Sequence, residues 1–189
     1  MRLLFCSVVG GAVLGCGTLS NAEIADSSAA VFLGPGQGKQ GKIGVNDITF
    51  KLDSSQTSGN LGSAEMLIQS GHMGAVPHYH SMFDEVVRVL EGTLTVLVGE
   101  TTYEVPAGGW HLRRRGVMHA FWNAGTVPAR SIEIYIPGGH EAFMKEIAAV
   151  FQSNPRPEQK LMDEIGARYD VHFLWDKLPA ILEKYNLKL

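Results

Sequence analysis

Two histidines and a glutamate, His78, His80 and Glu85, form the part of the sequence most suggestive of chemistry. Side chains alternate between the two faces of a strand, so His78 and His80 point the same way if this stretch is extended. Glu85 joins them only if the chain turns or bulges across residues 81–84. Two neutral imidazoles and one carboxylate aimed into a common space suit a divalent first-row metal ion. One more ligand is usually expected, and it has to come from elsewhere in the chain.

A second stretch, marked by spaced glycines, contains a further histidine, His119. The two stretches together resemble the cupins, a family of small β-barrel proteins. The first cupin motif has the spacing of His78, His80, Glu85 and Gly92, and the second has that of Gly108, Gly116, His119 and Asn123. Arg114 replaces the proline of the second motif, and His72 stands where the first motif has a leading glycine. Neither departure affects a ligand, and the resemblance covers residues 64–137.

The resemblance implies an all-β fold, namely a cupin-type double-stranded β-helix barrel (jelly roll). It also implies that one divalent transition metal ion is bound inside this barrel by His78, His80, Glu85 and His119. Iron, manganese, copper, nickel and zinc all stay open as the metal. The affinity order alone favours copper or zinc over iron or manganese, but the availability of metal often decides.

Within the cupins, His-Tyr-His followed by glutamate, with helices after the barrel, looks most like the quercetin dioxygenase-type branch. This resemblance implies a metal-dependent dioxygenase or other oxidoreductase that acts on a small enolic or phenolic compound. Glu85 would then be the catalytic residue, because it could take a proton from a bound hydroxyl group. A cupin lyase or isomerase is an alternative, and so is a non-catalytic barrel that binds a small molecule or metal. Fold and metal site together do not select a substrate.

Short β-like runs separated by turns extend from residue 48 to residue 136. They cover residues 48–52, 64–69, 86–90, 94–98, 102–105, 110–113, 119–122 and 131–136. Many short strands at regular spacing indicate an all-β sandwich or barrel. After Pro137 the apolar period becomes helical. Three apolar faces are predicted: Phe143, Ile147, Val150 and Phe151; Leu161, Ile165 and Tyr169; and Ile181, Leu182 and Tyr185. We expect these C-terminal α-helices to pack on the outside of the barrel.

The N-terminus has the pattern of a secretory signal, with Arg2 followed by an apolar run over residues 3–14 that is too short to span a membrane. We predict a signal peptide over residues 1–22, cut after Ala22. A lipoprotein box ending at Cys16 is the alternative, which would anchor the protein by a lipid. Both cysteines lie in this region, so an exported mature domain would contain no disulfide. The remaining chain divides into a flexible leader (23–45), a cupin barrel (46–137) and a helical extension (138–189).

Composition limits the partners. The chain of 189 residues is 45% hydrophobic and 19% charged, which fits one globular domain with a real core. Its net charge of −3 leaves no basic footprint, so nucleic acid is not an expected partner. A small molecule is the expected ligand, and a homodimer is an alternative that the sequence leaves undecided.

Several other side chains invite a functional interpretation, but ordinary roles are favoured. His72, His111, His140 and His172 lack ligand spacing and are interpreted as ordinary polar side chains. Three consecutive arginines, residues 113–115, favour a solvated face, although one of them could reach inward to hold an anionic group. Asn123 is expected to make turn or hydrogen-bonding contacts. Three aromatic residues flank the ligands, namely Phe83, Phe121 and Trp122. They are interpreted mainly as core residues and secondarily as the wall of a substrate pocket.

Overall fold

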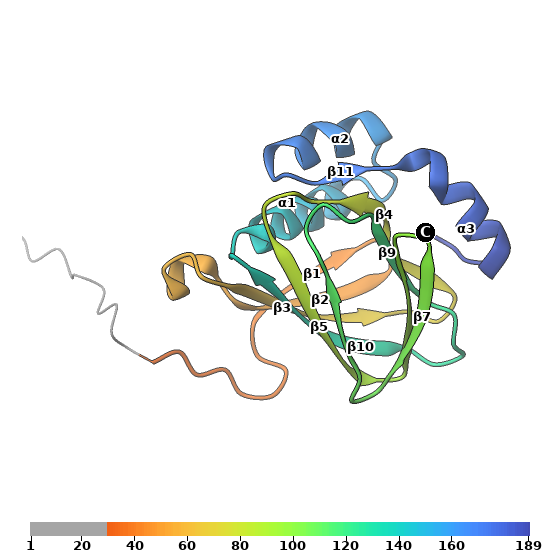
Figure 1. The fold of residues 1–189 in the computed structure, drawn as a ribbon. Coiled ribbons are helices and arrows are strands. Elements are labelled where there is room, and N and C mark those ends of the chain that lie inside the picture. Colours follow the sequence, from red (N-terminus) through yellow and green to blue (C-terminus); the bar gives the residue numbers. More distant parts are fainter. Residues whose placement is uncertain (1–29) are drawn as a thin grey trace, which may run out of the picture. The chain divides into compact units, whose positions relative to one another are not determined.

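The computed structural model describes residues 30–189, which form two antiparallel sheets and a set of C-terminal helices (Figure 1). The predicted signal peptide over residues 1–22 lies outside the described residues, as do both of its cleavage sites, at Ala22 and Cys16. Among residues 30–189, no helix is long and apolar enough to cross a membrane.

The larger sheet has six strands in the order β1-β2-β3-β10-β5-β8. Their bounds are Lys39–Ile43 (β1), Asn46–Leu52 (β2), Gly62–Ile68 (β3), Ala129–Ile136 (β10), Asp84–Glu91 (β5) and Trp110–Arg113 (β8). The smaller sheet has five strands in the order β11-β4-β9-β6-β7. Their bounds are His172–Phe173 (β11), His72–Tyr79 (β4), His119–Asn123 (β9), Thr93–Val98 (β6) and Thr101–Pro106 (β7). Two antiparallel sheets connected in this way confirm the predicted jelly-roll barrel.

Strict alternation along two central strands directs side chains into the barrel. On β5, Glu85, Val87 and Val89 are buried, and the residues between them are more exposed. On β10, the neighbouring strand, Glu133 and Tyr135 are buried in the same way. Both strands therefore carry an apolar face that also contains a carboxylate. Two buried carboxylates need partners, so the barrel interior has to contain compensating groups.

The pairing of β4 with β9 is irregular, and this irregularity aligns two histidines. The register shifts twice along the pair, and after the second shift His78 lies opposite His119. Gly74 is part of the irregular segment, and a Cβ atom there would lie 2.1 Å from the ring of Phe121. Only glycine therefore lets Phe121 lie flat against β4, next to the paired histidines.

The C-terminal helices pack outside the sheets, as predicted. They are α1 (His140–Ser153), α2 (Gln159–Arg168) and α3 (Leu178–Tyr185), with the short 3₁₀ segments Ser54–Thr57 and Trp175–Lys177 elsewhere. α1 contacts β1, β3 and α2, and its buried face includes Phe143 and Ile147. In α2 the buried side chains are Met162 and Ile165, so Ile165 lies on the buried face as expected, whereas Leu161, expected on the same face, is exposed. Figure 1 shows α1 and α2 side by side at one end of the barrel.

Three strands differ from the sequence expectation. β1 lies inside the segment expected to be a flexible leader (23–45), so that expectation is wrong for Lys39–Ile43, and the barrel sheet begins before residue 46. Its sequence, KQGKI, has little apolar periodicity, and its order comes from pairing with β2. β4 was not expected as a continuous strand, because Gly74 and Pro77 interrupt it. β11 comes from the helical extension and pairs with the edge of β4.

Candidate metal centre

The four predicted ligands come together where the two sheets meet. His78 lies in β4, His80 follows it directly, Glu85 is near the start of β5, and His119 begins β9. The chain turns between His80 and β5, as the position of Glu85 required. One potential ligand atom from each residue lies within 4.8 Å of the others, and all four residues are buried. The spacing in the sequence therefore predicted a real cluster in space.

Backbone carbonyl groups fix the orientation of all three imidazoles. The Nδ1 atom of His78 lies 2.8 Å from the carbonyl oxygen of Val76. That of His80 lies 2.7 Å from the carbonyl oxygen of Phe83, and that of His119 lies 2.9 Å from the carbonyl oxygen of Val117. A carbonyl can only accept, so each Nδ1 carries the proton and donates it. Each Nε2 is then left with a free lone pair.

The free Nε2 atoms provide a direct test of whether the residues fit a metal ion. Those of His80 and His119 are buried and have no hydrogen-bond partner within residues 30–189. Each lies close to Glu85, at 3.8 Å (His80 to Oε1) and 3.7 Å (His119 to Oε2). Buried polar atoms without a partner are unfavourable, and a carboxylate beside unprotonated imidazoles is a set of metal ligands. The residues fit a divalent transition metal ion.

Burial also keeps these imidazoles neutral, as metal ligands must be. Loss of solvation lowers the pKa of His78 to about 4, although the charge of Glu85 partly opposes the shift. The same desolvation lowers the pKa of His80, and it holds the pKa of His119 well below its ordinary value. At neutral pH no proton therefore competes with a metal ion for the three Nε2 atoms.

Arg113 sits between two buried carboxylates and is itself buried. Its Nη1 donates to Oε2 of Glu85 at 2.6 Å, and its Nη2 donates to Oε1 of Glu133 at 3.1 Å. Burial alone would raise the pKa of Glu85, but Arg113 together with His119, His140 and His80 outweighs this effect and holds that pKa well below its usual range. Burial raises the pKa of Glu133, and Arg113 opposes this shift only in part. Glu85 is therefore a charged ligand and a weak base.

The expectation that residues 113–115 form a solvated face is wrong for Arg113. This residue is 1% exposed, and its guanidinium group lies 4.1 Å from the centre of the Phe121 ring. The alternative, an arginine that reaches inward to an anionic group, describes it correctly, and that group is Glu85. Arg114 and Arg115 lie at the surface, and Arg115 pairs with Asp84. Alternation on β8, with Arg113 opposite Glu85 on β5, explains the difference.

His140 was expected to be an ordinary polar side chain, but the structure places it in the site. It is the first residue of α1, is 5% exposed, and has its Nε2 atom 3.5 Å from Oε1 of Glu85. Its ring lies 4.7 Å from those of both Phe83 and Tyr135. Its Nδ1 atom is buried without a partner in the described chain. The signal in the sequence was Pro137-Gly-Gly139, where the chain leaves the barrel and starts a helix.

The three aromatic residues near the ligands have different roles. Phe83 stacks on His80, with 3.7 Å between ring centres, and thus fixes the plane of that imidazole. Phe121 lines the cavity beside the ligands. Trp122 points away from the site into a second core cluster with α3, where it packs on Tyr185. Asn123 binds the carbonyl groups of Ile68 and Val127, which agrees with the hydrogen-bonding role expected for it.

The remaining histidines stay outside the ligand cluster. The Nδ1 atom of His72 lies 2.9 Å from the carbonyl oxygen of Ser70, and His172 contacts Asp170. His111 shares a face of β8 with Arg113, and neither of its buried ring nitrogens has a hydrogen-bond partner among residues 30–189. Burial lowers the pKa of His111 to about 3, and the charge of Arg113 adds to this shift.

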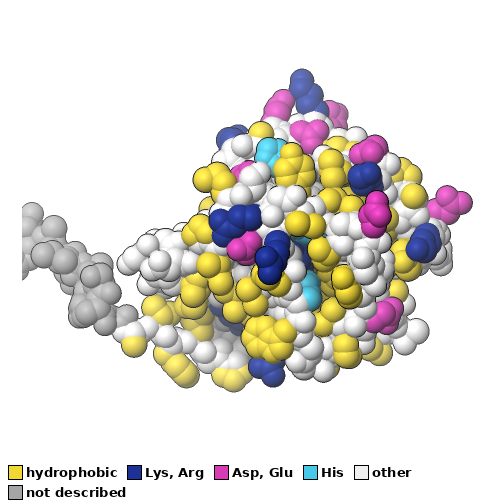
Figure 2. All heavy atoms as spheres, in the orientation of Figure 1, with side chains coloured by type: hydrophobic (Ala, Val, Ile, Leu, Met, Phe, Trp, Pro, Cys, Tyr) yellow, Lys and Arg dark blue, Asp and Glu magenta, His cyan; other side chains and the backbone are white. Residues whose placement is uncertain are grey.

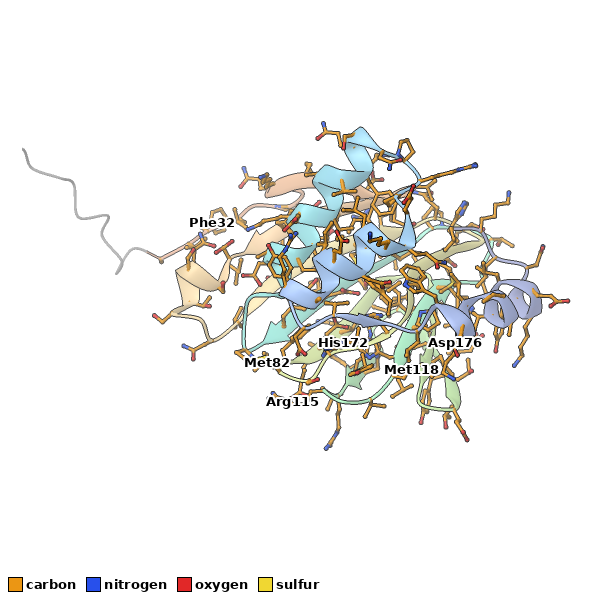
Figure 3. All side chains as sticks on the ribbon, turned by 90° about the horizontal axis from the view of Figure 1, so that it is seen from above. Phe32, Met82, Arg115, Met118, His172 and Asp176 are labelled. Atoms are coloured by element: carbon orange, nitrogen blue, oxygen red, sulfur yellow. The ribbon has the colours of Figure 1, made fainter. Side chains whose placement is uncertain are left out.

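A cavity of ≈ 890 Å³ reaches the ligand cluster, where His78 and Glu85 form part of its lining. It is bounded on one side by both sheets and on the other by α1 and by residues from α2 to the C-terminus. Figure 3 looks down on this end of the molecule and shows α1 and α2 lying across the strands. The helical extension thus forms one wall of the cavity, in addition to packing on the barrel.

Comparison with known proteins identifies the family of the barrel segment. A family model described as "Cupin domain" matches residues 64–135, which run from β3 to β10. The structure of KdgF from Halomonas sp. is similar over 60% of this chain and 99% of that chain, with a TM-score of 0.52 and 14% identity. Two further structures show a weaker likeness. The cupin domain of Cnp3 from Schizosaccharomyces pombe has a TM-score of 0.47 and 12% identity, with 57% of this chain and 74% of that chain covered. A predicted oxalate decarboxylase from Thermotoga maritima has a TM-score of 0.47 and 17% identity, with 49% of this chain and 80% of that chain covered. No curated protein sequence matches the chain.

The chain therefore contains a cupin domain over residues 64–135. The likeness to KdgF concerns the fold, since 14% of residues are identical. Within the barrel, the buried cluster of three histidines and one glutamate suggests a metal-binding site.

The buried position of Arg113 leads to a prediction about stability. Replacing Arg113 by methionine should lower the free energy of unfolding of the metal-free protein by about 3–5 kcal/mol, because Glu85 and Glu133 are left unpaired in the interior. Adding Glu133→Gln should restore part of this loss. Arg115→Met is the matched control, since its pair with Asp84 lies at the surface and should contribute little to stability. Urea unfolding measures all four proteins, and an equal loss for both arginine variants would contradict the prediction.

The buried imidazole of His111 leads to a second prediction. Its pKa is about 3 in the folded protein and lies near 6.5 when unshifted. The unfolded chain therefore takes up the proton first, and the stability that His111 provides at neutral pH is lost as the pH falls below about 6.5. Relative to His111→Leu, the metal-free wild type should lose on the order of 1–2 kcal/mol between about pH 7.5 and pH 5. Urea unfolding of both proteins measures the difference, which would not change with pH if His111 were solvated.

Proposed function

We propose that this cupin binds one divalent transition metal ion through His78, His80, Glu85 and His119. The observation that carries the proposal is the set of three neutral imidazoles whose Nε2 atoms are turned by carbonyl groups toward a charged carboxylate. Such an ion acts as a Lewis acid and, if it is redox-active, supports reactions with dioxygen. The second layer of hydrogen bonds, from the Nδ1 atoms to carbonyl groups and from Arg113 to Glu85, orients the ligands.

The ligand assignment predicts the metal content of variants. Wild-type protein should contain about one ion per chain, and His80→Ala or His119→Ala should weaken binding by at least about tenfold. His111→Leu should keep the wild-type content, because His111 lies outside the cluster. Elemental analysis after dialysis against a weak chelator provides the measurement. Equal metal in the wild type and in a His78→Ala/His80→Ala double variant would refute the assignment.

For the reaction, we propose a metal-dependent dioxygenase or related oxidoreductase acting on an enolic or phenolic compound. The largely apolar cavity beside the ligands supports this class, because its wall suits a weakly polar substrate. Oε2 of Glu85 is occupied by Arg113, so Oε1 is the oxygen that remains to accept a hydrogen bond from a substrate hydroxyl. His140, whose Nε2 atom is 3.5 Å from that oxygen, is placed to hold the same hydroxyl group.

One observation favours a second candidate function, a barrel that binds a small molecule without transforming it. The charge of Arg113 holds the pKa of Glu85 well below its usual range, and a carboxylate of this kind is a weak general base. Catalysis through proton abstraction by Glu85 is thereby disfavoured, whereas binding of metal and ligand is not. The expectation that the protein is exported rests on residues 1–22 alone and stays a prediction.

Oxygen uptake by metal-loaded protein distinguishes the two candidates. The wild type should consume oxygen with at least one compound from a panel of flavonols, catechols and enediols. Glu85→Gln should lower this rate about a hundred- to ten-thousand-fold, because an amide neither carries the charge nor accepts the proton. Glu91→Gln, on the same strand but exposed, is the matched control and should keep the rate. Absence of uptake by fully metal-loaded wild type would rule against the dioxygenase and favour the binding function, a lyase or an isomerase, and an active Glu85→Gln variant would remove Glu85 from the mechanism.

A further inference from the structure

Five buried titratable groups lie together in the inner wall of the cavity, which we call its inner end. His78, Glu85, Arg113, Glu133 and His140 line this end and are all buried. The Nδ1 atom of His140 has no hydrogen-bond partner in the described chain, although it is buried in the cavity wall. A buried imidazole nitrogen without a partner is an unfavourable arrangement that a ligand with a hydroxyl or carbonyl group would correct.

Beyond this end, the wall of the cavity is apolar over both the barrel and the helices. Buried methionines contribute on both sides, with Met66 and Met73 from the strands and Met144 and Met162 from the helices. Ile147 adds a branched side chain on α1. Methionine is unbranched and adapts its shape to a neighbour, so a wall with several of them fits an extended apolar group of no fixed outline.

The mouth of the cavity is formed by exposed residues from three separate segments. They are the β1–β2 turn with Val45, the α1–α2 connection with Arg156, and the C-terminal residues Lys188 and Leu189. A ligand that reaches from the buried polar groups to this mouth must pass the whole apolar wall. The surface view in Figure 2 shows hydrophobic side chains widely exposed over the face that it draws, so an apolar surface alone does not identify a site.

The volume decides between a small and an extended ligand. At roughly 30 Å³ per water-sized group, a ring with two hydroxyl groups fills only about a quarter of the ≈ 890 Å³. The rest would be left to water against an apolar wall, which is unfavourable. A short dicarboxylate would leave still more of the wall wet. The cavity thus matches a molecule with one compact polar end and a longer apolar body.

We propose that the cavity takes an amphiphilic small molecule, with its oxygen-bearing head beside the ligand cluster and His140 and its apolar body along α1 toward the mouth. The position of the head rests on the proposed function, whereas the position of the body rests only on the apolar wall. The two parts can therefore be tested separately.

Anaerobic calorimetric titration with 4-alkylcatechols, from methyl to octyl, tests the body. Each added methylene should tighten binding about three- to fourfold until the chain reaches the mouth. Met144→Glu should remove this dependence on chain length and leave the metal content unchanged. Met144→Gln is a milder variant with the same expected direction, in case the first does not fold. Ala149→Gln, on the exposed side of the same helix, should behave as the wild type.

Metal-free protein separates the two proposals. The dependence of affinity on chain length should persist without metal. Only the part of the binding free energy that comes from the catechol head, and is the same for all chain lengths, should become weaker. Affinity that does not change with chain length, in either form of the protein, would overturn the inference about the body. A persisting dependence together with no bound metal in the wild type would overturn the proposed function and leave the amphiphile site standing.

Discussion

The pairing of Arg113 with two carboxylates is the interaction on which the interior of the barrel depends. Glu85 and Glu133 both point inward from adjacent strands, and neither could stay charged there alone. One guanidinium between two carboxylates leaves an excess of one negative charge, and the raised pKa of Glu133 shows how the site relieves part of it. A divalent cation beside Glu85 would compensate the remainder. The same electrostatic arrangement thus stabilises the barrel and prepares it for a metal ion.

Much of the fold followed from the sequence, because alternation and turn glycines are local signals. The strands from β5 to β10 were predicted near their observed positions, and the two spaced motifs indicated the jelly roll. β1 and β11 were missed for a common reason. KQGKI and His172–Phe173 carry no alternation of their own, and each is a strand only because a partner strand lies beside it. Pairing of this kind depends on distant residues, which local propensity cannot report.

The candidate site shows the same division between local and distant information. The four ligands were predicted because their spacing is fixed by two short motifs. Arg113 was not, because three consecutive arginines do not reveal which one faces inward until β8 is placed in register with β5. His140 was not, because it joins the site from a helix that begins 21 residues after His119. A residue that joins a site from a separate helix or strand has no fixed sequence distance from the ligands, so no motif reveals it.

The helical extension changes what the barrel can do. Without α1, the inner end of the cavity would be open to water, and water would weaken the interactions among Glu85, Arg113 and the imidazoles. With α1 in place, His140 enters the site and Phe143 and Ile147 close the wall above it. The cupin motifs supply the four candidate ligands, whereas one wall of the cavity comes from residues outside the motifs. On the proposed function, specificity would therefore depend on residues that the family pattern does not include.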